Sequence, residues 1–114
     1  MPTEPSLFEL YINKKGKIAE YIPATAMAFV YGEREAKNPE ILKEYTLVCR
    51  IKVGDMEMEI YVNRDGELIK YIPATGKIFE LVSEGEVEDL DAMFKEYTFV
   101  CQVNLEVIAK IEGE

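Results

Sequence analysis

The chain has 114 residues, with 13 Lys and Arg against 22 Asp and Glu, and a formal charge of -9 at pH 7. This excess of acid repels phosphate backbones and anionic lipid headgroups, so neither nucleic acid nor a membrane surface is expected as a partner. Hydrophobic residues make up 48% of the chain, which predicts a single globular domain over 1–114 that buries about two-thirds of its unfolded surface.

The first six residues (MPTEPS) form a polar lead that lacks the basic and apolar regions of a signal peptide. The chain also has no continuous apolar run of about 18 residues, the length that a membrane-spanning helix needs. We therefore expect a cytoplasmic protein. A composition rich in Lys and Glu, without His or Trp, favours a thermophilic source.

Two β-hairpins are predicted, each around a turn that begins with Asn and ends with Gly. The first joins strand-like residues 7–13 to 17–22 through Asn-Lys-Lys-Gly, and the second joins 56–63 to 67–72 through Asn-Arg-Asp-Gly. Asn at the first place and Gly at the fourth fit a type I turn in which Gly supplies a positive φ.

Each hairpin ends in the same five residues, Tyr-Ile-Pro-Ala-Thr. Proline cannot donate to a ladder, so the second strand ends there. The segments that follow, 26–31 and 77–82, are short and rich in Phe, Val, Tyr, Ile and Leu. They favour a third strand over a helical turn capped by Thr25 or Thr75.

A short helix is predicted after each third strand. Residues 86–96 place apolar side chains at spacings of three and four, typical of a helix that packs on a sheet. The first helix is shorter, with Asn38 as its N-cap and Pro39 at its first position.

The segment 97–111 has apolar residues at every odd position and mostly polar residues between them. This alternation predicts a strand with one face on a core. An equivalent strand at 45–53 is expected to pair with the strand from Met56 through a two-residue loop, Gly54-Asp55.

We interpret the chain as a tandem duplication of a β-β-β-α-β unit, with repeat 1 at about 7–53 and repeat 2 at about 56–105. By pseudo-twofold symmetry, the strand at 97–105 should pair with the strand at 7–13. The expected fold is α+β and β-rich, with one mainly antiparallel, barrel-like sheet that is closed or nearly closed and two short helices.

The terminal strand is too long for a compact domain if it continues to 111. Extended over 97–111 it would span about 50 Å, against a domain diameter of about 35 Å. The strand must therefore bend, break near Asn104, or reach another chain. We expect the extension at 106–111 to cover the edge of the barrel or to build a homo-oligomer contact.

The two cysteines, Cys49 and Cys101, occupy equivalent places on the apolar phase of their strands. The simplest interpretation is a small buried hydrophobe repeated by duplication. A disulfide stays open if the symmetry brings the two strands together, and thermophile cytosols allow such bonds. A catalytic thiolate is not favoured, because the chain has no His to act as its base.

Most catalytic and metal-binding motifs are excluded by composition. Without His there is no Ser-His-Asp or Cys-His arrangement, and two cysteines alone cannot make a structural zinc site. Residues 74–77 (Ala-Thr-Gly-Lys) lack the earlier Gly of a P-loop. The acidic run at 84–91 does not follow the spacing of a calcium loop. We expect no cofactor and no metal.

The repeated Tyr-Ile-Pro-Ala-Thr and Lys-Glu-Tyr-Thr segments are the remaining site candidates. If the two copies meet, they form a small-ligand cleft with aromatic walls and a few polar groups. Its expected residues are Tyr21, Tyr71, Thr25 and Thr75, with Glu9, Glu59, Lys43 and Lys95 as polar contacts. A Glu beside a Tyr is also a candidate proton-transfer pair. The alternative is that both segments were inherited at duplication and serve only the turns and the helix-to-strand junctions.

Three classes of function follow. The favoured one is a non-catalytic interaction or assembly module, because the chain offers a compact scaffold, an overlong terminal strand and no catalytic constellation. Its partner is an unknown protein or a second copy that docks on the C-terminal strand. The alternatives are a small-molecule-binding regulatory domain, with a cleft between the repeats, and an enzyme that uses Glu, Tyr or Lys or a bound metal.

Overall fold

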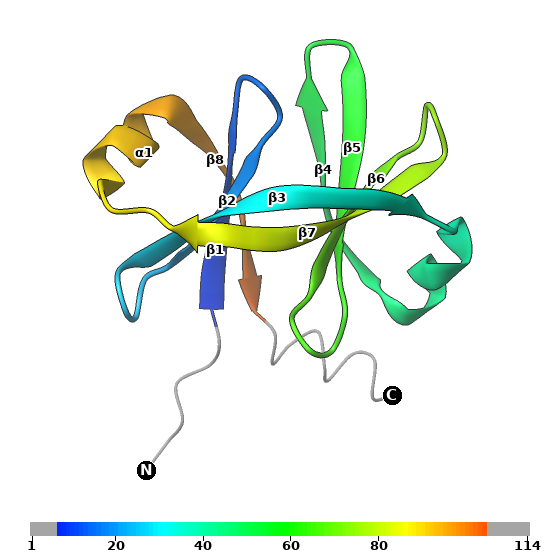
Figure 1. Ribbon diagram of the computed structural model, residues 1–114, viewed down its shortest axis with the longest axis horizontal. Helices are drawn as coiled ribbons and strands as arrows, with labels where there is room; N and C mark the ends of the chain where they lie inside the picture. Colours follow the sequence, from blue (N-terminus) through cyan, green and yellow to red (C-terminus); the bar gives the residue numbers. More distant parts are fainter. Residues whose placement is uncertain (1–6, 105–114) are drawn as a thin grey trace.

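The computed structural model describes residues 7–104, which form one antiparallel sheet of eight strands with two short helices (Figure 1). The strands are β1 (Leu7–Asn13), β2 (Ile18–Ile22), β3 (Met27–Lys37), β4 (Thr46–Val53), β5 (Met56–Val62), β6 (Leu68–Ile72), β7 (Lys77–Glu86) and β8 (Tyr97–Asn104). A 3-10 helix, η1 (Pro39–Glu44), precedes β4, and an α-helix, α1 (Leu90–Glu96), precedes β8. The extension at 106–111, with its expected role in a homo-oligomer, lies outside the described residues.

Both predicted hairpins are confirmed, and their turns use the same bonds. The side-chain oxygen of Asn13 accepts 2.9 Å hydrogen bonds from the backbone N–H groups two and four residues later, and Asn63 does the same in the second hairpin. Gly16 and Gly66 have φ values of 83° and 86°. Only glycine adopts such values without strain, so the turn is specified by two residue types at fixed places.

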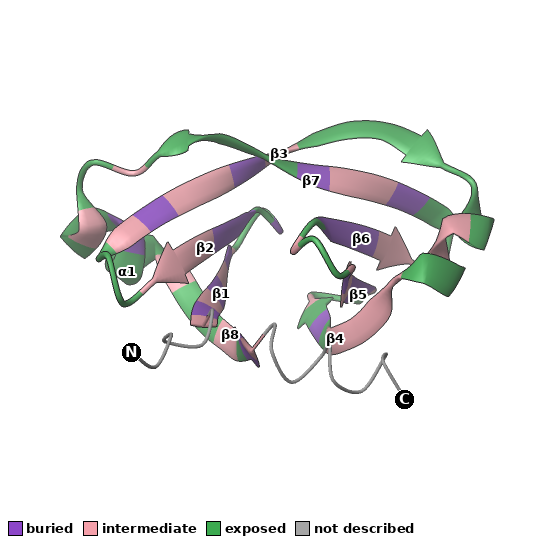
Figure 2. Ribbon diagram, turned by 90° about the horizontal axis from the view of Figure 1, so that it is seen from below, coloured by how far each residue is buried: buried purple, intermediate pink, exposed green. Residues whose placement is uncertain are grey.

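The segments after the two Tyr-Ile-Pro-Ala-Thr sequences are strands, as predicted, but β3 and β7 continue well beyond 31 and 82. They pair with each other at the centre of the sheet, with Gly32 opposite Val82. A Cβ on Gly32 would lie 2.7 Å from Cγ of Glu84, so a larger residue there would have to displace the exposed Glu84 side chain. The second halves of both strands are exposed (Figure 2). Their charged residues carry no apolar period from which their length could be read.

The two helices start at caps, one where predicted and one later. The side-chain oxygen of Asn38 accepts from the backbone N–H of residue 40, and Pro39 is at the first position, as expected. The helix is a 3-10 helix with no buried residue. The second helix begins at Leu90 rather than 86, because β7 extends to Glu86 and Asp89 is the N-cap, accepting a 3.2 Å bond from the N–H of residue 92.

The strand order is β4-β5-β6-β7-β3-β2-β1-β8, which confirms the expected pairings of β4 with β5 and of β8 with β1. Figure 1 shows β1, β2 and β8 on one side and β4, β5 and β6 on the other, with β3 and β7 running across both. The end strands β4 and β8 approach each other, so the sheet is a nearly closed barrel. We call β8-β1-β2 with α1 the first lobe, and β4-β5-β6 with η1 the second lobe.

The main core lies inside the sheet and draws on both lobes. Its buried members are Phe8, Leu10, Ile12, Ile18, Tyr31, Ile51, Met58, Ile60, Val62, Leu68, Leu81 and Val103. A second cluster lies on the outer face of the first lobe, where Met93 of α1 packs on Ala19 and Ala28. The helix is therefore held by an apolar contact to the outside of the sheet, not by the main core.

A single face for all odd residues of the last strand is wrong. The register of β8 against β1 shifts at Val100, and that of β4 against β5 shifts at Val48, so each edge strand has a β-bulge. Beyond the bulge the alternation changes face: Cys101 packs against the main core, whereas Tyr97 packs against the outer cluster. Phe99 is 49% exposed. An unpaired extra residue leaves no trace in a period-two pattern.

Candidate functional site

Four aromatic side chains gather on the outer face of the first lobe, and we call them the aromatic surface. They are Tyr11 of β1, Tyr21 of β2, Phe94 of α1 and Phe99 of β8. The ring of Tyr11 lies 5.3 Å from that of Phe94 and 5.5 Å from that of Phe99, and the rings of Tyr21 and Phe94 are 5.2 Å apart, centroid to centroid. These are the tilted and edge-to-face contacts that aromatic rings prefer.

Two of these rings remain open to solvent: Phe99 is 49% exposed and Phe94 is 39% exposed. Phe99 reaches this face because of the bulge at Val100, and it lies directly opposite Tyr11 in the ladder. Large apolar side chains that remain exposed together, rather than singly, are typical of an interaction surface.

A carboxylate adjoins the aromatic surface and is held by its neighbours. Oε1 of Glu9 accepts a 2.8 Å bond from the hydroxyl of Tyr11, and Oε2 accepts a 3.0 Å bond from the side-chain amide of Gln102 on β8. Burial, with the bond to Glu9 second, raises the pKa of Tyr11 to about 12. The phenol therefore keeps its proton at neutral pH and serves as a donor.

The second lobe has the same arrangement with a different third partner. Glu59 accepts a 2.7 Å bond from the hydroxyl of Tyr61 and a 2.9 Å bond from Nε of Arg50 on β4. The bond from Tyr61, together with Arg50, lowers the pKa of Glu59. Burial, followed by the bond to Glu59, raises the pKa of Tyr61 to about 12. These shifts keep the proton on Tyr61, so the pair is suited to fixing side chains in place rather than to exchanging protons near neutral pH.

The predicted cross-strand pairs are present: Glu9 lies opposite Tyr21, and Glu59 lies opposite Tyr71. The hydrogen-bonding tyrosine is nevertheless the one two residues further along the same strand. The hydrogen bonds therefore join Glu9 and Glu59 to Tyr11 and Tyr61, not to the cross-strand tyrosines.

The structure does not bring the two Tyr-Ile-Pro-Ala-Thr segments together. The turn at Thr25 leads into the start of β3 and the turn at Thr75 into the start of β7, and each start pairs with the other strand's end. The two turns thus lie at opposite ends of the β3–β7 ladder (Figure 1). The expected cleft of Tyr21, Tyr71, Thr25 and Thr75 is not formed. Each threonine hydroxyl donates to the backbone carbonyl three residues earlier, that of Ile22 or Ile72, a bond that closes the turn.

The two predicted lysines are exposed in the last turns of the two helices. Lys95 belongs to a groove of about 400 Å³ lined by Asn13, Lys14, Lys15, Lys95 and Glu96, which we call the lysine groove. Three of its five residues are lysines, and no ion pair is found for these three within residues 7–104. In a chain of charge -9, this groove is a local reversal of sign.

The corresponding groove of the second lobe has mixed charge. It measures about 430 Å³ and is lined by Glu44, Asn63, Arg64 and Asp65. Lys43, which matches Lys95, is not among its lining residues. Basic character is therefore specific to the first lobe.

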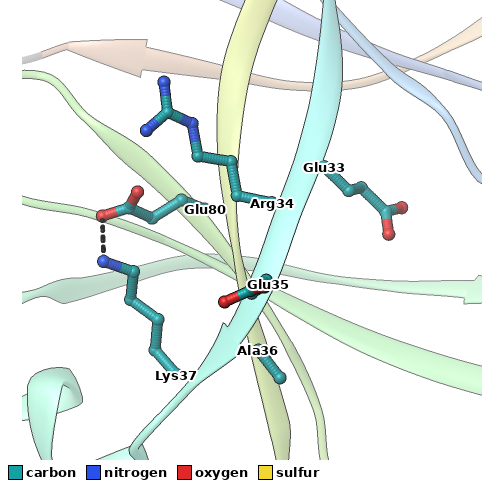
Figure 3. Close-up of a pocket in the computed structure, with 6 residues that line it drawn as sticks. All are labelled: Glu33, Arg34, Glu35, Ala36, Lys37 and Glu80. Carbon is teal, nitrogen blue, oxygen red and sulfur yellow. Dashed lines mark ion pairs between the residues drawn. The ribbon is translucent and has the colours of Figure 1, made fainter.

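A larger groove, of about 720 Å³, lies along the exposed half of β3 (Figure 3). Its lining is charged apart from Ala36, and Lys37 pairs with Glu80 at 3.1 Å. Figure 3 shows Arg34 and Glu80 on one side of the strand and Glu33 directed away from them. Without apolar walls, this groove lacks the usual character of a small-ligand pocket.

Sequence reasoning missed most of the aromatic surface. The odd-position pattern predicts that Phe99 faces the core, because it does not show the bulge at Val100, and no sequence motif points to Tyr11. Lys14 and Lys15 occupy the middle of a turn, where the sequence alone predicts no site. One feature of the sequence does point to this surface: Phe94 is followed directly by Lys95 in the same helix, which places an aromatic ring near a basic side chain.

No model of a known protein family matches the chain, and no curated protein or solved structure matches it significantly. Within residues 7–104, none of the helices has the length and apolar character needed to cross a membrane. The same part of the chain contains no group of three or more His, Cys, Asp or Glu side chains placed to hold a metal ion.

Proposed function

We propose that this protein is a non-catalytic interaction module that binds an acidic segment of a partner protein, one that also carries apolar side chains. The observation that carries the proposal is the exposure of Phe99 beside Tyr11, in a surface that continues into three lysines with no ion pair among residues 7–104. The aromatic rings supply apolar contact area, and the lysines supply charge of the opposite sign to an acidic partner.

Continuity between the two parts supports a single binding surface. Lys95 follows Phe94 in α1, and Asn13, which lines the lysine groove, is two residues beyond Tyr11 on β1. A segment lying along β1 would thus contact rings first and ammonium groups next. The carboxylate of Glu9 already accepts hydrogen bonds from two donors. Its partial desolvation at the edge of such a contact therefore costs little free energy.

Several further expectations belong to the same proposal. The matched turn bonds, caps and bulges of the two lobes support an origin by tandem duplication with pseudo-twofold symmetry. A cytoplasmic site of action and a thermophilic source follow from composition alone.

The test compares matched substitutions in the two lobes. Fluorescein-labelled synthetic peptides, in which Glu and Asp alternate with Leu and Phe, are titrated with the protein and followed by fluorescence anisotropy. We expect Phe99→Ser and Lys95→Glu each to weaken binding on the order of tenfold. The equivalent changes in the second lobe, Leu47→Ser and Lys43→Glu, should leave the affinity unchanged. Peptides with Lys in place of the acids should not bind.

Three results would overturn the proposal. The first is equal loss of affinity from both members of a matched pair, and the second is binding that does not depend on peptide charge. The third is a concentration-dependent dimer in sedimentation velocity that Phe99→Ser abolishes, because a second copy would then cover the surface in place of a partner.

A further inference from the structure

The two cysteines occupy the two free edges of the sheet. β4 and β8 are the ends of the strand order, and no backbone ladder joins them within residues 7–104, although they approach each other. Cys49 lies opposite Ile60 of β5, and Cys101 lies opposite Leu10 of β1. Each directly follows the bulged residue of its strand. Both side chains are half-buried and pack against the main core, so the bulges direct the two thiols to the same place.

The two thiols are in contact across this seam. Their side chains lie within hydrogen-bonding reach of each other. A hydrogen bond between them, with burial second, raises the pKa of Cys49, and the same bond lowers the pKa of Cys101. Cys101 is therefore the thiol that ionises first, while Cys49 keeps its proton. An asymmetric pair of this kind has a distinct attacking and resolving sulfur.

We propose that Cys49 and Cys101 are a disulfide-forming site, whose oxidation by a small-molecule disulfide such as glutathione disulfide covalently closes the barrel between β4 and β8. The chain has only these two cysteines, so no other intramolecular pairing competes. The contact joins backbones that no ladder connects, which is where a covalent bond adds a constraint that the hydrogen bonds do not already provide.

The chemistry proceeds in two exchanges. The thiolate of Cys101 attacks one sulfur of the oxidant disulfide, whose S–S bond breaks and releases one thiolate. Cys49 then loses its proton to solvent, and its thiolate attacks the Cys101 sulfur of the mixed disulfide. The second half of the oxidant leaves as a thiolate. In sum, two protein thiols become one disulfide, and one small-molecule disulfide becomes two thiols.

Closure has two measurable consequences. The new bond encloses residues 49–101, which limits the unfolded chain, and we expect the melting temperature to rise on the order of 10 °C. It also fixes two edge strands that otherwise rely on side-chain packing at this seam, so amide exchange in β4 and β8 should slow.

The experiment equilibrates the full chain with glutathione disulfide or with dithiothreitol and compares melting temperature, amide exchange and intact mass. We expect an intramolecular disulfide between the peptides that contain Cys49 and Cys101, at a yield independent of protein concentration. Cys49→Ser and Cys101→Ser should each remove the difference between the oxidised and reduced melting temperatures. Glutathione adducts or inter-chain dimers as the main product would overturn the proposal, and so would an internal disulfide that leaves the melting temperature unchanged.

A second measurement tests the order of the steps. Brief treatment of the reduced protein with iodoacetamide should label Cys101 well before Cys49, and Cys49→Ala should remove the advantage of Cys101 by removing its hydrogen-bond donor. Equal labelling of the two thiols in the reduced protein would contradict the assigned roles.

Discussion

The two lobes have side chains of different volume at matched positions on the outer face of the sheet. At matched positions of the sheet the first lobe has Ala19 and Ala28, and the second lobe has Ile69 and Ile78, all fully buried. The small residues of the first lobe leave room for Met93 of α1, which is 3% exposed. In the second lobe, η1 has no buried residue. Side chains from the sheet and from the helix fill the space between them to a constant density. Small sheet residues therefore accompany a helix that buries a large side chain.

The lobes also differ in the charge that each places on the inner face of its second hairpin strand. Glu20 of β2 occupies the position that matches Lys70 of β6. Each lies on the same face of its strand as the main-core residues two positions before and after it. Lys70 is buried and forms an ion pair with Glu33 of β3, above the ring of Phe79 at 5.7 Å. Glu20 has no ion pair or hydrogen bond among the described residues, and burial raises its pKa to about 7.

The unpaired state of Glu20 has a local explanation. Around the central pair of Gly32 and Val82, the position of Glu33 on β3 corresponds to Ser83 on β7. In the second lobe, the carboxylate that pairs with Lys70 comes from Glu33, in the first half of the chain. At the corresponding position, the first lobe has only the hydroxyl of Ser83. A buried carboxylate without a charged partner is expected to hold its proton more tightly.

The largest effect is expected from the volume difference. Met93→Ala should lower the free energy of unfolding by about 3 kcal/mol, because it leaves a cavity over Ala19 and Ala28. The counterpart in η1 is Ile41→Ala, which should cost only about 1 kcal/mol, since Ile41 is half-buried. Urea unfolding of both variants measures the difference. Equal losses would show that α1 and η1 contribute equally to stability by packing on the sheet, which would contradict the prediction.

A second, smaller effect is expected from the ion pair. Glu33→Gln leaves the ammonium of Lys70 buried without its partner and should cost about 2 kcal/mol, less than for a fully buried pair because the Glu33 side chain is 47% exposed. Adding Lys70→Met, which removes the charge and keeps the chain length, should restore most of this stability. Thermal or urea unfolding of the single and double variants decides the matter, and additive losses would argue against coupling between the two residues.

The smallest effect is expected at Glu20, and it depends on pH. Its pKa of about 7 in the folded state is above the usual value of 4.5, so the folded state binds the proton more tightly than the unfolded state. Stability from this group is therefore present below pH 4.5 and is lost as pH rises through 7. Glu20→Gln should be more stable than the wild type by about 1 kcal/mol at alkaline pH, a figure reduced for partial solvation, and no more stable in acid. Unfolding curves recorded across this range that stay parallel would refute the assignment.

The sequence predicted the local elements well, because each has a local cause. Asn13 and Gly16 specify a turn by themselves, and so does the Asn38-Pro39 start of η1. The pairing of β3 with β7 was not predicted, since the second halves of these strands are charged and carry no period. The bulges at Val48 and Val100 were also missed, and with them the outward position of Phe99. Features that depend on an unpaired residue or on two exposed strands meeting are set by the assembled sheet and not by a neighbouring residue type.

The pairing of the last strand, β8, with the first strand, β1, has a consequence for the order in which the molecule can assemble. β1 lies between β2 and β8, and Glu9 is bonded to a glutamine 93 residues further along the chain. During synthesis the first three strands emerge long before their last neighbour, so one flank of β1 stays open until the chain is almost complete. Sequence separations of this size are associated with slow folding. The first hairpin is therefore incompletely paired until β8 is synthesised. Until then Phe8 and Leu10 of β1 are accessible to any chaperone that binds nascent apolar strands.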